Sequence, residues 1–158
     1  MAGGIHPHNK TEVARRLAIS IRRQVFNRTS LPQITAAEGA RPISANMLQV
    51  WFSPSSTSLV WGPTHNCSIC CTAETQIVLV CLEGVNCTDS RQPWMNSTAH
   101  VVGGDDEAPT LQASIPKAAT AVRYAWSNFP ECVLFDENQL PVGPFFLPVS
   151  KSGMRPAS

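Results

Sequence analysis

The first strongly periodic segment of the chain is TEVARRLAISIRRQVF, residues 11–26. Its apolar stripe recurs every four positions, at Val13, Leu17, Ile21 and Val25, and its arginines fall mainly on the other side. This period is typical of an amphipathic helix that buries one face. Pro7 suits a first helical turn, because the amide hydrogen it lacks has no partner there anyway. The pattern therefore predicts a half-buried helix near the start of the chain.

From about Asn27 the pattern changes to short apolar runs separated by turn-rich clusters. The segment RTSLPQITAAEGARPIS predicts a linker or an edge segment. The runs that follow predict strands: MLQVWF, SLVW, QIVLVCL, TAHVV, TLQASI, TAVRYAW, VLF and PFFL. Short strands at this spacing are typical of an antiparallel sandwich or a small barrel. The predicted fold class is mainly β, with an N-terminal amphipathic helix followed by an antiparallel β-sandwich-like domain.

Three details refine this picture. In TAVRYAW, Val122, Tyr124 and Trp126 alternate with Arg123 and Ala125, which predicts one buried face. The acidic cluster GGDDE predicts a solvated hairpin turn, since it lacks the spaced ligands of a calcium loop. The tail SKSGMRPAS predicts disorder. The expected organisation is a helical segment over 1–28, a β domain over 29–149 and a disordered tail over 150–158.

Composition narrows the function classes. The 158 residues carry a net charge of +1, so no basic excess points to nucleic acid. The longest apolar run, IVLVCL, is far short of the roughly 20 residues that cross a bilayer, so no membrane span is predicted. The opening MAGGIHPHNK has no apolar core of a secretory signal.

Cysteines and glycosylation sequons point instead to an oxidising compartment. The chain has six Cys, and Asn-x-Ser/Thr sequons occur at Asn9, Asn27, Asn66, Asn86 and Asn96. Both features favour a lysosomal or secreted glycoprotein. Because no signal segment accompanies them, the chain is expected to be incomplete at its N-terminus or to use an alternative start.

The cysteine spacing allows two interpretations. Cys81 and Cys87 bracket the turn LEGVN and are the preferred disulfide. The pairing of the other four stays open, at Cys67, Cys70, Cys71 and Cys132. His65 with the first three of these has the soft ligands that zinc favours, but adjacent cysteines bind one ion poorly, so no metal or other cofactor is predicted.

Among the remaining residues, His6 and Trp94 stand out. An imidazole beside a helix N-terminus can act as a general base, although a His so near the chain end can equally be mobile. Trp94 lies in the polar stretch RQPWMNST and is the tryptophan predicted to contact a ligand. The other three lie in apolar runs and are predicted to pack in the core, at Trp51, Trp61 and Trp126. The helix arginines are predicted to form a solvated face, with binding of acidic glycans as the alternative.

Three motifs in order resemble the sialate O-acetylesterase family. IHPHNKTEVARRLA resembles the segment that closes its catalytic domain, where an IHP-x-(N/D)-K-x-x-V-(A/G)-x-R-L signature holds the base of a catalytic triad. VCLEGVNCTDSRQPWMNSTAHV resembles its Cys-rich stretch, and AVRYAWSNFPECVLFDENQLPVGPFF resembles its ending. The resemblance implies that the helix is the last helix of an SGNH-type α/β hydrolase core.

The same resemblance implies removal of O-acetyl groups from sialic acids or sialoglycans. A Ser would attack the acetyl ester while the His, here His6, takes the Ser proton. The family's Gly-x-Ser-Asn motif is absent from the sequence, as is the acidic residue before the His. The chain is therefore expected to be the C-terminal part of such an esterase and to be silent alone. The alternative is a non-catalytic secreted β module that binds glycan or protein.

Overall fold

The computed structural model describes residues 10–53, 58–64, 70–87, 94–104, 107–127 and 130–150. The chain divides into two compact units, Met1–Ile34 and Thr35–Ser158. We describe each unit by itself. No helix in the described ranges is long and apolar enough to cross a membrane.

The first unit contains one helix, α1 (Lys10–Gln24), at the place that the periodicity predicts. Within the first unit, α1 buries none of its residues. Val13 is 49% exposed and Leu17 is 58% exposed. On the other side, Glu12 accepts salt bridges of 2.7 Å from both Arg15 and Arg16. Within the first unit, these salt bridges are short-range pairs of the helix itself.

The segment after α1 turns back on the helix. Asn27 adopts a left-handed conformation with φ 49°, which asparagine tolerates better than most residues. The Arg23 guanidinium then donates to the carbonyl oxygens of Thr29 at 3.1 Å and Leu31 at 2.6 Å. At least this arginine therefore has a structural role, whereas Arg22 stays exposed on the solvated face that the sequence predicts.

The second unit is antiparallel β structure, as the run of short apolar segments predicts. Its strands are β1 (Ala37–Ser44), β2 (Met47–Phe52), β3 (Leu59–Pro63), β4 (Ile77–Leu82), β5 (Met95–Gly104), β6 (Glu107–Ser114), β7 (Ala119–Tyr124), β8 (Cys132–Asp136) and β9 (Phe145–Pro148). Only β1 was not predicted as a strand. Pro42 and the polar residues of β1 interrupt the alternation of apolar residues by which a strand is predicted. The expectation of an edge segment nevertheless agrees with the position of β1 at one end of the sheet.

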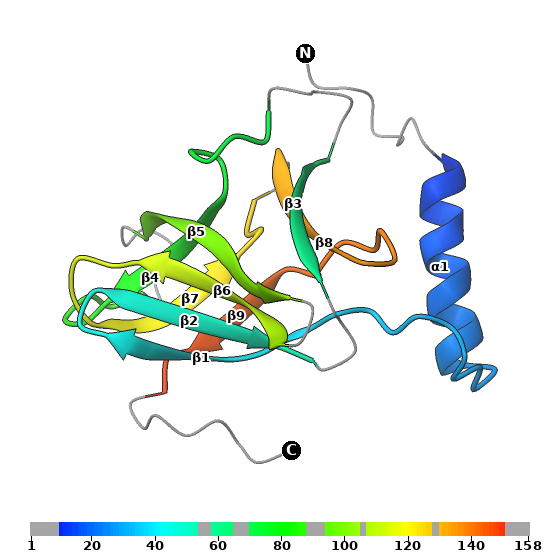
Figure 1. The fold of residues 1–158 in the computed structure, drawn as a ribbon, viewed down its shortest axis with the longest axis horizontal. Helices are drawn as coiled ribbons and strands as arrows, with labels where there is room; N and C mark the ends of the chain where they lie inside the picture. The colour runs from blue at the N-terminus through cyan, green and yellow to red at the C-terminus, as the bar shows by residue number, and fades with distance from the viewer. Residues whose placement is uncertain are drawn as a thin grey trace. The chain divides into compact units, whose positions relative to one another are not determined.

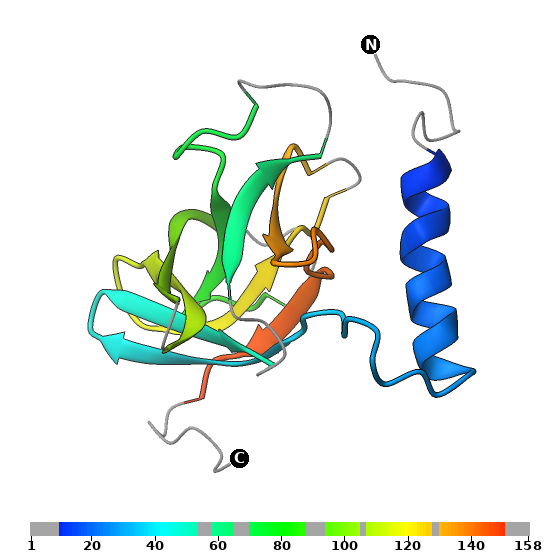
Figure 2. The same cartoon turned by 45° about the vertical axis from the view of Figure 1, so that its right-hand side comes forward.

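The larger sheet has the order β1-β2-β6-β5-β4-β7-β9 and is nearly closed. Its two end strands meet at a parallel bridge between Ala40 and Val149. The backbone N–H of Ser150 also donates to Ala40 O at 2.9 Å, so the ordered chain extends one residue into the predicted tail. The rest of that tail, 151–158, lies outside the described residues. Figures 1 and 2 show the sheet curling so that β7 and β9 lie behind β2 and β6.

The smaller sheet, β3-β8, is joined to the larger one through Tyr124 at the end of β7. The backbone N–H of Leu134 donates to the Tyr124 hydroxyl oxygen. The Tyr124 ring stacks on Phe145 at 5.1 Å and lies 5.9 Å from Trp61. Burial raises the pKa of Tyr124, so the hydroxyl stays neutral and keeps this contact.

The alternation predicted for TAVRYAW stops at Tyr124. Val122 and Tyr124 are buried as expected, but Trp126 is 54% exposed, so the prediction that it packs in the core is wrong. Ala125 adopts a left-handed conformation with φ 51°, which ends the strand and turns the next side chain away from the core. Local alternation could not reveal this backbone turn.

Candidate functional site

Strand alternation separates the two faces of β1, β2, β6 and β5. Leu48, Val50 and Phe52 of β2 point into the core, so Gln49 and Trp51 lie on the outer face. The registers then place one outer-face residue from each strand in a single row: Arg41, Gln49, Gln112 and His100. A row of polar side chains thus crosses four neighbouring strands.

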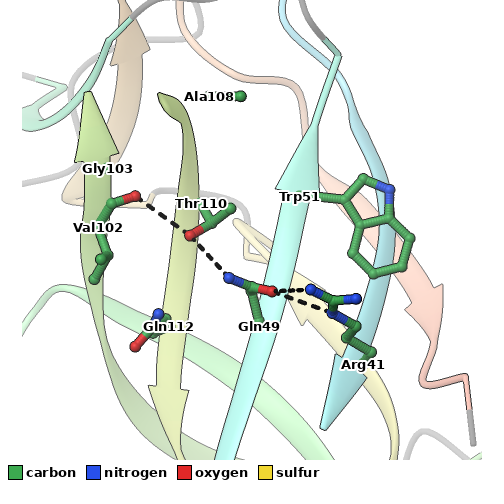
Figure 3. A pocket seen from close by; sticks show the side chains of 8 residues that line it. All are labelled: Arg41, Gln49, Trp51, Val102, Gly103, Ala108, Thr110 and Gln112. Atoms are coloured by element: carbon green, nitrogen blue, oxygen red, sulfur yellow. Dashed lines mark hydrogen bonds between the residues drawn. The ribbon is translucent and has the colours of Figure 1, made fainter. Parts of the chain in front are cut away.

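Hydrogen bonds run in one direction across these strands (Figure 3). Arg41 donates from Nε and Nη2 to Gln49 Oε1, at 3.2 and 3.1 Å. Gln49 Nε2 donates to Thr110 Oγ1 at 3.2 Å. Thr110 donates in turn to the carbonyl oxygen of Val102 at 3.3 Å. These bonds fix the orientation of the Gln49 amide, which would otherwise rotate freely.

Trp51 flanks this row on the β1 side. Its backbone pairs with Gly39, and a Cβ added at Gly39 would overlap the Trp51 ring. The indole therefore lies across β1 at a position that only glycine leaves open. Only 7% of Trp51 is exposed, so the ring is an immobile wall beside Arg41.

Arg41, Gln49 and Gln112 of this row line a shallow cavity of about 400 Å³ together with the Trp51 indole, whereas His100 does not line it. Its remaining lining residues come from β5 and β6: Val102, Gly103, Ala108 and Thr110. Within the described ranges, the side chains of Gln112 and His100 take part in no hydrogen bond. The cavity thus combines a fixed hydrogen-bonded half with one polar side chain, that of Gln112, which remains able to bind a ligand.

A second cluster lies on the outer face of the opposite half of the sheet. The Arg123 guanidinium lies 4.1 Å from the centre of the Trp94 ring, and Trp94 meets Phe146 edge-on at 5.9 Å. Burial lowers the pKa of Arg123, although an arginine stays charged at any ordinary pH. Trp94, predicted to contact a ligand, is thus part of a cation–π cluster.

Only some of the site residues predicted from the sequence motifs lie within the described residues. His6 and Asn66 lie outside the described residues, as do Asn9, His65 and the Asp105–Asp106 turn. The three described sequon asparagines, Asn27, Asn86 and Asn96, are all exposed. The structure therefore leaves these three accessible to glycosylation.

The cysteines form disulfides. Cys81 pairs with Cys87 with a Cα–Cα distance of 6.0 Å, which is the pair preferred from the sequence. Cys71 pairs with Cys132 at 4.9 Å and ties the start of β8 to the loop before β4. Cys70 is disulfide-bonded as well. Neither Cys70 nor Cys71 therefore offers a thiolate for the zinc site considered above, and the described residues contain no other metal-ligand cluster.

Sequence reasoning missed the polar row on β1, β2, β6 and β5. The signal was present in part, since Gln49 and Trp51 alternate with apolar residues, as do Thr110 and Gln112. Nothing in the sequence shows that β2 pairs with β6, or that Arg41 belongs to the neighbouring strand. The site depends on pairing between segments about 60 residues apart.

Comparison with protein-family models, with curated proteins and with solved structures gives no match for this chain.

Proposed function

We propose that the β unit is a carbohydrate-binding module and that the Arg41–His100 row with Trp51 is its binding face. The observation that carries the proposal is the series of hydrogen bonds from Arg41 through Gln49 to Thr110. Beside it lies the Trp51 indole, which occupies the space left by the missing side chain of Gly39. A sugar presents hydroxyl groups at fixed spacing and an apolar ring face. Amides supply donors and acceptors together, and an immobile indole supplies the apolar contact.

The cavity and its charge suit a small acidic glycan. About 400 Å³ falls within the range of roughly 300–1,000 Å³ of small-molecule sites. Arg41 is the cationic group lining it, and its positive charge attracts a carboxylate. The family resemblance suggests sialic acid, or a sialoglycan, as the acidic sugar. The ligand that we propose is therefore a sialylated glycan bound without chemistry at this face.

Titration with N-acetylneuraminic acid, followed by NMR or calorimetry, tests the proposal. The Gln112→Ala variant should weaken binding by about tenfold, which corresponds to one lost hydrogen bond of about 1–1.5 kcal/mol. His100→Ala, which removes a side chain of the row outside the cavity, should weaken it less. Ser114→Ala is the matched control, because Ser114 is an exposed residue of β6 next to this row. Equal affinity in all three variants would contradict the proposed site.

A second candidate function concerns the first unit. We propose that the chain is the C-terminal part of a sialate O-acetylesterase-like hydrolase, in which His6 is the base and the β unit is a sandwich-like accessory domain. The observation that favours it is the α1 stripe, whose Val13, Leu17 and Ile21 are 49%, 58% and 41% exposed. An amphipathic helix of this kind usually buries its apolar side against a larger core. The last helix of an SGNH-type core would do so.

An esterase assay separates the two candidates. The chain is assayed beside a version extended upstream by a catalytic domain, each with and without His6→Ala. The extended form should hydrolyse an acetyl ester and lose that activity with His6→Ala, since the base is then missing. The short form should be inactive, and His6-dependent turnover by it would contradict this account.

A further inference from the structure

The outer face of β4, β7 and β9 differs in character from the polar face described above. The registers place Asn96, Leu79, Arg123 and Phe146 in one row across β5, β4, β7 and β9. Their neighbours in sequence, such as Val80, Val122 and Phe145, are buried in the core, so this row points outward. It starts at a sequon asparagine and ends at an exposed aromatic ring.

Trp94 enlarges this apolar surface. It precedes Asn96 by two residues, a spacing that places both side chains on one face of a strand, and it covers Arg123 at 4.1 Å. Phe146 is 52% exposed. In the described part of the chain, Trp94 Nε1 and Arg123 Nε have no hydrogen-bond acceptor. The surface is therefore aromatic and is uncovered at its β9 end.

We propose that an N-linked glycan on Asn96 lies across this surface and covers it. Asn96 is exposed and begins the sequon Asn-Ser-Thr. Neighbouring strands are about 4.8 Å apart, so Arg123 lies only about 10 Å from the attachment point. The first sugars of the glycan can thus reach Trp94 and Arg123 without leaving the sheet. The C–H faces of these sugars suit contact with aromatic rings.

The modification itself is ordinary chemistry of the secretory pathway. Asn96 Nδ2 attacks C1 of N-acetylglucosamine in a lipid-linked oligosaccharide diphosphate. The C1–N bond forms, the C1–O bond to the diphosphate breaks, and the amide proton leaves with the lipid diphosphate. The Cys71–Cys132 and Cys81–Cys87 disulfides are of the kind that form in the same oxidising compartment.

The test uses the chain secreted from mammalian cells, with glycopeptide mass measurement of occupancy. Thr98→Ala removes the sequon and keeps Asn96, and Thr88→Ala removes the Asn86 sequon as a matched control. We expect Asn96 to be occupied. Thr98→Ala should raise the binding of a hydrophobic dye and lower Tm by about 2–4 °C, whereas Thr88→Ala should change neither.

Combining variants separates the glycan contact from an intrinsic effect of Thr98. In a Phe146→Ser background, removal of the Asn96 sequon should change Tm and dye binding much less, because the apolar contact is already gone. An unoccupied Asn96, or equal effects in both backgrounds, would overturn the proposal. So would a glycosylated protein that dimerises and becomes monomeric with Phe146→Ser, because a second copy would then cover the surface.

Discussion

Trp51 and Gly39 depend on each other across the β1–β2 pair. The indole occupies the space that a side chain at position 39 would need, and a break in register lies between Ala37 and Gly39. The same indole forms one wall of the cavity beside Arg41. The absence of a side chain at Gly39 therefore determines the position of the indole that lines the candidate site.

Gly39→Ala should displace the Trp51 ring, because the new Cβ has no room. Overpacking of this kind costs about 1–3 kcal/mol of the free energy of unfolding. Chemical denaturation with tryptophan fluorescence measures the loss, and glycan binding should weaken together with it. Gly143→Ala is the control, since no atom lies within 4 Å of a Cβ added there. An unchanged stability in Gly39→Ala would mean that the indole moves freely.

At the scale of the element, α1 forms where its pattern predicts, and its first turn carries a charged cluster. Glu12 is the acidic residue of its first turn and binds two arginines of the next turn, Arg15 and Arg16. A negative charge there also interacts favourably with the helix dipole. These charges contribute a small, pH-dependent share of the stability of the helix.

The pKa of Glu12 is lowered to about 2, mainly by the hydrogen bond from Arg15 and then by that from Arg16. Its contribution to helix stability is fully present above the ordinary pKa of 4.5 and is lost as the pH falls through about 2. A carboxyl-carbon NMR titration of the chain measures the midpoint. Arg15→Gln combined with Arg16→Gln should move it back toward 4.5. An unmoved midpoint would mean that these arginines are not its cause.

At the scale of the whole molecule, the larger sheet is nearly closed, so its two edge strands lie next to each other. The Ala40–Val149 bridge joins the first and last strands of the larger sheet, and the Cys71–Cys132 disulfide ties the smaller sheet to the loop before β4. These links connect segments far apart in the sequence. The shape of the polar face therefore depends on contacts between distant segments that close the sheet, more than on any single strand.

The two described disulfides should differ in what they contribute. Cys71–Cys132 spans 61 residues and Cys81–Cys87 spans 6. In the chain-entropy model the longer loop stabilises the fold by about 4 kcal/mol and the shorter by about 2 kcal/mol. Paired Cys→Ser variants, compared by chemical denaturation, measure the two losses. A larger loss for the Cys81–Cys87 pair would show that local strain or packing outweighs the entropy of the unfolded chain.

The sequence by itself determined the elements that depend on near neighbours. Periodicity located α1 and every strand except β1, and a short loop favoured Cys81–Cys87, because these features involve residues only a few positions apart. Only the tertiary structure decided the strand order that aligns Arg41 with Gln49, Gln112 and His100. It also decided the exposure of Trp126, which follows from a left-handed backbone at Ala125. Pairing between distant segments is set by how the whole core closes, and no local pattern carries that information.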